Sequence, residues 1–303
     1  MCPADSKLEA IVRRVQWVQS LPFFLVHLVA FAGPFLVPFS WTWVAVAVAL
    51  YVVRMFGITA GYHRYFSHRA YKTGRGFQAV LAVLGATSAQ KGPLWWAANH
   101  RHHHLESDTP DDVHSPVQHG FWWSHVGWIM SGAYDRTQLE RVKDFARYPE
   151  LHWLNRNHLI PPTLLAVLCA VLGGTTGLVW GFFVSTVLLW HGTFTINSLS
   201  HVFGSRRYAT SDDSRNNGLL ALITMGEGWH NNHHHYQSTA NQGFYWWELD
   251  LSFYVLLGLE RLGLVRDLRR VPAKVRDHHT AAQALAAVRS PERKPEMVAR
   301  ASL

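Results

Sequence analysis

The chain has 303 residues, of which 49% are hydrophobic and 16% are charged, and its mean hydropathy of -0.02 would suit an ordinary soluble protein. This average conceals two stretches, residues 15–53 and 157–205, that contain no Lys, Arg, Asp or Glu. Each is longer than the roughly 20 residues that cross a bilayer, which excludes a simple soluble domain. With Cys2 and Cys169 as the only cysteines, the sequence also argues against a disulfide framework or a cysteine metal site.

The first uncharged stretch predicts two membrane-spanning helices. It divides near Pro38 into spans at about residues 17–37 and 41–60. Basic residues precede it, as they do in a signal peptide, but its length and its prolines indicate an uncleaved first span. Residues 1–16 are therefore predicted to be a cytoplasmic N-terminus.

The second uncharged stretch predicts another pair of helices. A glycine-rich turn at residues 173–177 divides it into spans at about residues 158–172 and 178–196. Pro161 and Pro162 fit the first turn of the third span, where a missing N–H costs little.

The distribution of positive charge orients these spans. The two short connections within the pairs contain no Lys or Arg, so the positive-inside rule places both ends of each pair in the cytoplasm. The predicted fold is an all-α integral membrane protein with four transmembrane helices in two hairpins. A cytoplasmic helical cap is expected from residues 61–157 and 197–268, with interfacial helices near residues 77–84 and 246–262.

The net charge of +8 comes mainly from the C-terminal segment. From Arg261 onward there are ten Lys or Arg against four Asp or Glu. We expect residues 269–303 to form a basic cytoplasmic tail facing anionic lipid, with one surface helix near residues 280–288. No recognition motif accompanies the charge, so nucleic acid is not the expected partner.

The 20 histidines equal all Asp and Glu together, and three clusters of them stand out. They are HRYFSH at residues 63–68, HRHHH at residues 100–104 and HNNHHH at residues 230–235. The second and third clusters each contain histidines at i, i+3 and i+4, which on a helix places three imidazoles on one face, within reach of a common ion.

The first cluster has a different spacing. His63 and His68 are five residues apart, which on an ideal α-helix separates them by about 140°. We therefore expect them to converge where the helix ends, near Ser67.

Histidines gathered in this way indicate a metal site, because a metal binds the neutral lone pairs that neighbouring imidazoles would otherwise leave unpaired. Imidazole ligands suit Zn, Cu, Fe and Ni. Eight or more histidines exceed the four of a structural zinc site, so the clusters predict two metals.

The clusters resemble the three histidine boxes of membrane-bound fatty acyl desaturases of the stearoyl-CoA Δ9 type. The third box extends to GEGWHNNHH at residues 226–234, and FWWSHVGW at residues 121–128 and NSLSH at residues 197–201 resemble further segments of that family. The resemblance covers about residues 57–268 and implies a desaturase domain over residues 17–268 with a similar four-span topology.

The resemblance implies a di-iron centre, and no catalytic residue beyond the metal ligands is expected. Asn197 would hold a water near one iron, and His201, four residues later, could lie on the same helix face. The implied histidine ligands are His63, His68, His100, His103, His104, His201, His230, His233 and His234.

The implied activity is the O2-dependent insertion of a cis double bond, at the Δ9 position, into a saturated acyl chain. Acyl-CoA is the favoured substrate, while an acyl lipid or another acyl thioester stays open. Electrons are expected from a separate cytoplasmic protein of the ferredoxin, rubredoxin or cytochrome b5 type. The basic residues that follow the Gly-Trp pair in animal acyl-CoA desaturases are absent after Trp128, so Arg101, Lys72, Arg75 and Lys91 are the remaining candidates to meet CoA phosphates.

Further substrate residues follow from the same resemblance, although ordinary helix packing explains several of them equally well. Tyr51 and Met55 match positions near the closed end of the acyl tunnel, and Trp96 and Phe194 match its bend. The complete set of predicted substrate residues is Tyr51, Met55, Trp96, Phe194, Arg101, Gln90 and Trp128.

Other polar residues are candidates for supporting roles. His27 and His191 lie in spans, where an ionisable side chain is costly and usually functional, but neither has a partner visible in the sequence. Carboxylates that could orient ligand imidazoles are Asp108, Asp111, Asp112 and Glu227.

Two alternative functions stay open. A hydroxylase acting on alkyl chains would keep the same histidine pattern. A metal transporter or sensor would instead need ligands within the spans, whereas here the histidine clusters lie outside them on one side.

Overall fold

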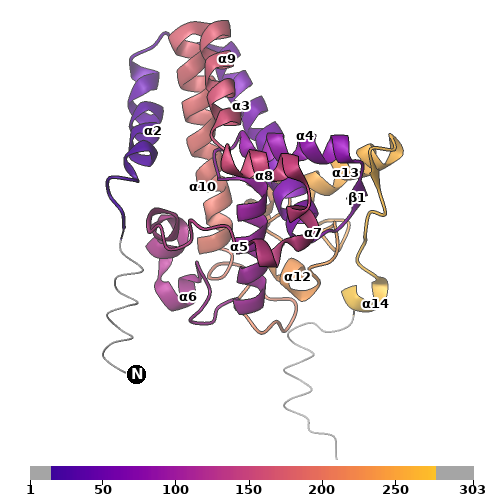
Figure 1. The fold of residues 1–303 in the computed structure, drawn as a ribbon. Helices are drawn as coiled ribbons and strands as arrows, with labels where there is room; N and C mark the ends of the chain where they lie inside the picture. Colours follow the sequence, from indigo (N-terminus) through magenta and orange to yellow (C-terminus); the bar gives the residue numbers. More distant parts are fainter. Residues whose placement is uncertain (1–14, 278–303) are drawn as a thin grey trace, which may run out of the picture.

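The computed structural model describes residues 15–277, and Figure 1 shows that the regular secondary structure among them is almost wholly helical. The predicted surface helix at residues 280–288, and most of the predicted N-terminus and tail, lie outside the described residues. Three long helices, α3, α9 and α10, run side by side at one end of the molecule, and shorter helices gather at the other end (Figure 1). These helices are α3 (Trp41–Phe56), α9 (Ile160–Gly177) and α10 (Ser185–Ser198), and a shorter apolar helix, α2 (Leu21–Ala32), precedes them in the chain.

The α3 helix begins where the sequence predicts but continues beyond residue 60. Ser40 caps it, because its hydroxyl accepts a hydrogen bond from the Trp43 N–H. The π-helical segment η2 (Gly57–Ser67) extends the same helix without a break, so the whole element runs over Trp41–Ser67. By length and composition it is long and apolar enough to cross a membrane.

The second long apolar element, Ile160–Ser198, reverses direction at the predicted glycine turn. Gly174 has φ 57° and ψ -145°, a conformation open to glycine that ends the helix there. A Cβ at Gly181 would lie 3.0 Å from the Cys169 sulfur, whereas these residues would be about 18 Å apart in a continuous helix. The predicted hairpin is therefore confirmed, with η6 (Leu178–Val184) and α10 as its second arm.

The first predicted span is shorter than expected. Helix α2 and the turn η1 (Gly33–Phe35) together cover Leu21–Phe35 rather than residues 17–37. Within the described residues, two elements, Trp41–Ser67 and Ile160–Ser198, meet the length expected of a membrane span. The four-span topology stays a prediction.

The cap surrounds the end of the η2 segment. Helix α4 (Arg75–Ala86), at the predicted interfacial position, packs directly on η2, because a Cβ at Gly57 would lie 2.8 Å from the Gly85 nitrogen. Helix α13 (Leu251–Arg261) begins later than predicted, since the Asp250 carboxylate caps it by accepting from the Phe253 N–H.

One small sheet departs from the all-α prediction. Strands β1 (Lys72–Thr73) and β2 (Val265–Arg266) pair antiparallel, with Lys72 opposite Arg266, and join the two ends of the cap. The remaining elements are α5 (Pro93–Glu106), α6 (Pro116–His119), η3 (Trp123–Gly127), η4 (Trp128–Met130), η5 (Leu139–Arg141), α7 (Lys143–Ala146), α8 (Pro149–Arg156), α11 (Gly218–Ile223), α12 (His230–His235) and α14 (Ala273–Arg276).

Candidate metal centre

The π-helical winding of η2 brings His63 and His68 together. The His68 N–H donates to the His63 carbonyl oxygen at 3.1 Å, an i to i+5 bond. A π turn carries more residues than an α turn, so side chains five apart come onto nearly the same face. The two imidazole centroids lie 4.8 Å apart. The expected convergence at the helix end is thus achieved by a change in winding, which the spacing alone does not reveal.

Helices α5 and α12 carry the other two histidine clusters, as predicted, but each helix divides its ligands between two sites. His100 and His104 of α5 join one group, while His103 joins another. Helix α12 does the reverse, because His233 joins the first group and the pair His230 and His234 joins the second. The expectation that each triplet meets one common ion is wrong.

The structure brings all nine predicted ligand histidines into two groups, and within each group the candidate ligand atoms lie within 4.8 Å of one another. We call them the five-histidine group and the four-histidine group. The five-histidine group contains His63, His68, His100, His104 and His233, and the four-histidine group contains His103, His201, His230 and His234.

Hydrogen bonding alone does not satisfy the five-histidine group. Four Nε2 to Nε2 contacts of 2.9 to 3.0 Å link its members in a chain, from His63 through His233, His104 and His100 to His68. A ring nitrogen offers either one proton or one lone pair, so each nitrogen serves one such contact. At most two of the four contacts can then be hydrogen bonds, whereas a central cation would use every lone pair.

The electrostatics favour the neutral imidazoles that a metal requires. Burial, followed by the neighbouring imidazoles, holds the pKa of His68, His100, His104, His230 and His233 well below its usual range. Burial likewise lowers the pKa of His234 to about 4. Lone pairs are therefore available at neutral pH.

The four-histidine group contains a buried nitrogen that fits a metal. The His234 side chain is almost fully buried, and its Nε2 has no hydrogen-bond partner among the described residues. Its Nδ1 is bound by the Asp212 carboxylate, so Nε2 is left as the lone pair facing the group. The residues present thus fit a resident metal at this position.

Carboxylates hold the outer nitrogens of four ligand candidates, an arrangement typical of metal-binding histidines. The His103 Nδ1 lies 3.0 Å from Asp112, and the His201 Nδ1 lies 2.8 Å from Asp108. Glu227 pairs with the His63 Nδ1, as Asp212 does with that of His234. The sequence anticipated three of these carboxylates, whereas among residues 15–277 no hydrogen bond or ion pair joins the Asp111 side chain to a histidine.

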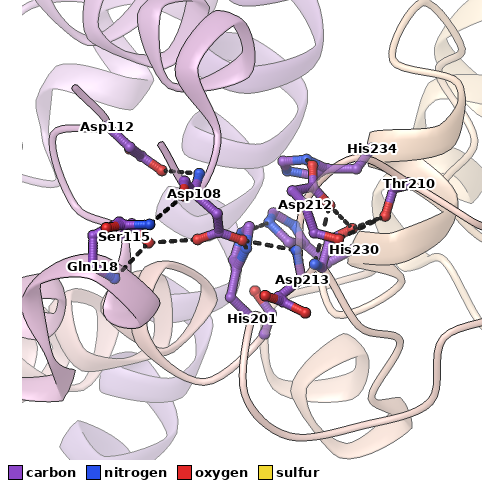
Figure 2. A network of polar contacts seen from close by, with 12 residues as sticks. Asp108, Asp112, Ser115, Gln118, His201, Thr210, Asp212, Asp213, His230 and His234 are labelled. Carbon is purple, nitrogen blue, oxygen red and sulfur yellow. Dashed lines mark hydrogen bonds and ion pairs between the residues drawn. The ribbon is translucent and has the colours of Figure 1, made fainter. Parts of the chain in front are cut away.

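Asp212 was missed because it lies in the loop after the fourth apolar helix and forms no motif with a histidine. Asp108 lies opposite that loop at the end of α5 (Figure 2). One of its oxygens accepts from both His201 and the Asp213 N–H, each at 2.8 Å, and the other accepts from Ser115. Asp108 also has φ 59°, a left-handed conformation that aspartate tolerates better than most residues. It therefore ties the α5 end to the 212–213 loop and orients His201.

A buried arginine supports the five-histidine group. Arg64, one residue after His63, donates to Glu227 at 3.1 Å and pairs with Asp250 at 2.9 Å. The Glu227 carboxylate thus lies between His63 and Arg64. Although burial raises the pKa of Glu227, His63 and Arg64 outweigh it and keep this pKa below its usual range.

The two histidines in the predicted spans do have partners. The His27 Nε2 lies 3.1 Å from the His191 Nε2, and the His191 Nδ1 lies 2.9 Å from the His125 Nε2. The His125 Nδ1 contacts the Ser198 hydroxyl at 2.8 Å. This chain of imidazoles ties α2 and η3 to α10, next to Asn197.

Two apolar cavities approach the histidine groups from the membrane-helix side. The larger, of about 360 Å³, is lined by residues of α2, α9 and α10, and the smaller, of about 40 Å³, lies between the histidines and Met55. Five residues line both cavities and mark their junction: Trp96, His100, His114, Thr193 and Asn197.

The structure places most predicted substrate residues on these cavities. Gln90, Trp128 and Phe194 line the larger cavity, Met55 lines the smaller and Trp96 lines both. His114 also lines both cavities and groups with His103 and Asp112.

Two predicted substrate residues lie elsewhere. The Tyr51 hydroxyl donates to the Ile223 carbonyl oxygen, and this side chain lines neither cavity. Arg101 is held by Asp144 and by the carbonyl oxygens of Phe66 and Ser67 at the end of η2. It locks the His68 end of η2 to α5 rather than facing a cavity.

All four cations considered for the acyl carrier are paired with carboxylates. The shortest N to O distances are 2.7 or 2.8 Å. The pairs are Lys72 with Asp267, Arg75 with Glu150, Lys91 with Asp135, and Arg101 with Asp144.

Comparisons with known proteins agree with this geometry. A family model described as fatty acid desaturase matches residues 39–259. The sn-1 stearoyl-lipid 9-desaturase of Anabaena variabilis is 37% identical over 263 residues, covering 86% of this chain and 96% of that protein. The sn-2 palmitoyl-lipid 9-desaturase of Nostoc sp. (strain 36) is 35% identical, covering 88% and 94%. The acyl-CoA 5-desaturase of Anemone leveillei is 37% identical, covering 82% and 78%.

Proposed function

We propose that this chain, which belongs to the fatty acid desaturase family, inserts a cis double bond at the Δ9 position of a saturated acyl chain in an O2-dependent reaction. The observation that carries this proposal is the junction of the two apolar cavities at the histidine groups. Two of the relatives named above are 9-desaturases, which supports the position of the double bond.

The resident metals of the proposal are two irons, one held by each histidine group. Asn197 would hold a water near one of them, which is supported by its place where the two cavities meet. Bound iron would supply the O2-derived oxidant that an unactivated methylene group needs. The chain's own residues hold the ligands, exclude water from the acyl chain and fix which carbons approach.

The cavities support a bent path for the acyl chain. It would enter the larger cavity, pass between Trp96 and Phe194, and end beside Met55 in the smaller cavity. Because Met55 is 1% exposed and closes that end, its size would limit the length of the tail beyond the new double bond.

The charges favour a lipid as the acyl carrier over the acyl-CoA expected from the sequence. CoA phosphates need several unpaired cations, whereas the charged lining residues of the larger cavity, Lys91 and Asp135, neutralise each other. The α2, α9 and α10 residues that line this cavity belong to apolar helices that would face lipid. The relatives named above include both lipid and acyl-CoA desaturases.

The proposed setting is a multi-pass membrane protein with four spans in two hairpins and the histidine groups on the cytoplasmic side. Support comes from the absence of Lys and Arg in the two short turns and from the hairpin at Gly174. Electrons would come from a cytoplasmic carrier protein of the ferredoxin, rubredoxin or cytochrome b5 type.

The decisive experiment is lipid profiling of a desaturase-deficient host that expresses the full chain, with His230→Ala as the control. We expect oxygen-dependent cis-Δ9 alkenes in lipid-bound acyl chains, none of them with His230→Ala, and about two irons per purified chain. An alcohol product would indicate the hydroxylase alternative. Metal uptake by the host without any new acyl product would indicate a transporter or sensor.

A further inference from the structure

A third cavity reaches the histidine groups from the side away from the apolar cavities. It has a volume of about 330 Å³ and lies between the end of α5, the 209–212 loop and the end of α12. Its apolar lining residues are Leu105 and Ala209, and the others carry hydroxyl, amide, carboxylate or imidazole groups. We call it the polar cavity.

The polar cavity leads from the surface to both histidine groups. Leu105 is 71% exposed and Ser211 is also exposed, so these residues mark its outer end. At its inner end are His104 of the five-histidine group and His234 of the four-histidine group. His234 and its partner Asp212 are both buried.

The polar lining of this cavity suits water. Four of the ligand candidates have a carboxylate on their outer nitrogen, but the buried Nδ1 atoms of His104, His230 and His233 have no partner among the described residues. A metal-binding histidine nearly always donates its other N–H to a carboxylate, a carbonyl or a water. For these three histidines the described residues supply neither a carboxylate nor a carbonyl, and His104 is the one of them that lines the polar cavity. A polar space of this size is easily large enough to hold water.

We propose that the polar cavity is the water and proton port of the metal centre, separate from the cavities that hold the acyl chain. This inference rests on the proposed function, because the protons consumed and the waters produced in that reaction need a route to solvent. Reduction of one O2 to two waters takes four electrons and four protons. The two hydrogens removed from the acyl chain supply two of each, and the electron-donor protein supplies two more electrons. The other two protons come from solvent, and two waters leave.

The apolar cavities do not serve this purpose when substrate is bound. The acyl chain fills the junction between Trp96 and Asn197, and a hydrocarbon neither carries protons nor makes room for water. In the polar cavity, Thr210, Ser211 and Gln237 can hydrogen-bond water along the way. At the inner end of the cavity, an Asp212 oxygen is bound to His234 (Figure 2).

The test is solvent exchange at the iron-loaded centre, measured without turnover. The full chain in nanodiscs of distearoyl lipid is prepared in the mixed-valent state and mixed with D2O. Pulsed EPR then follows the appearance of deuterium coupling. Ser211→Trp, which plugs the outer end, is compared with Ser205→Trp, a matched change at an exposed serine of the same segment that does not line the cavity.

We expect Ser211→Trp to slow deuterium entry by about tenfold or more, and Ser205→Trp to leave it unchanged. Thr163→Trp, which narrows the larger apolar cavity, should also leave it unchanged. Gln237→Leu, which makes the polar cavity less polar with little change in size, provides a second variant if Ser211→Trp does not fold.

Equal exchange rates in wild type and in both polar-cavity variants would overturn the proposal. It would also be overturned if Thr163→Trp slowed deuterium exchange while the polar-cavity variants did not. Because exchange is measured without turnover, its outcome is independent of product formation. If exchange depends on the polar cavity but no alkene ever forms, the desaturase proposal fails and the port stands.

Discussion

The carboxylate of Asp108 is predicted to control metal affinity at the four-histidine group. It accepts from the His201 Nδ1 and the Asp213 N–H at 2.8 Å each, and from the Ser115 hydroxyl. Asp108→Asn keeps the shape and tolerates the φ of 59°, but it replaces one acceptor oxygen with an NH2 donor. With the NH2 on one side, both the His201 Nδ1 and the Asp213 N–H lose their acceptor, and with it on the other side the Ser115 hydroxyl does. In either orientation His201 loses the negative charge of its carboxylate partner.

The loss of such a partner typically costs roughly 10- to 100-fold in metal affinity. This corresponds to about 1.4 to 2.7 kcal/mol of binding free energy. Asp108 contacts His201, which belongs to the four-histidine group alone. The five-histidine group should therefore keep its iron. The variant purified under limiting iron should therefore contain about one iron per chain where the wild type contains about two.

The assay is elemental analysis combined with an iron titration, and the control is Asp111→Asn. Asp111 lies in the same loop and is exposed, and within the described part of the chain its side chain forms no hydrogen bond or ion pair with a histidine. The control should bind iron as the wild type does, and thermal unfolding of the metal-free proteins should show that both variants fold. Two tightly bound irons in Asp108→Asn would refute the reasoning.

Three further outcomes are expected. Gly85→Ala should lower the free energy of unfolding by about 1–3 kcal/mol, because its Cβ would lie 2.3 Å from a buried tyrosine ring. Gly76→Ala in the same helix, where a Cβ meets nothing within 4 Å, should raise it by about 0.4–1 kcal/mol, and thermal unfolding of the two variants should therefore shift in opposite directions. Met55→Ala should shift the preferred acyl chain toward greater length, as read by product profiling of mixed acyl lipids, and unchanged preference would count against Met55 as the closed end. Arg101→Gln leaves Asp144 and two helix-end carbonyls without their donor, so we expect a loss of about 1–3 kcal/mol in thermal unfolding together with weaker iron binding at the five-histidine group.

Local signals in the sequence predicted much of the fold. The glycine-rich turn at Gly174 and the proline start of α9 depend on short-range sterics, and the structure confirms them. The start of α13 was missed by several residues, although Asp250 directly before the apolar run is a local N-cap signal that marks it.

The candidate site was predictable in its members but not in their arrangement. All nine histidines come together, since their number and clustering already indicated a metal. Their division into two groups depends on how α5 and α12 face each other, which no local pattern reveals. Asp212 could not be found because its pairing with His234 joins a loop to a helix 22 residues away.

The division of ligands explains how the two metal positions are held in a fixed relation. Helix α5 gives an i, i+4 pair to the five-histidine group and its i+3 member to the other, and α12 does the opposite. Each helix therefore contributes ligands to both groups from a single turn, which couples the positions of the two groups. The segment η2 contributes to one group alone, and His201 to the other alone. A change in η2 should thus alter one metal position, whereas a change in the backbone of α5 or α12 should disturb both at once.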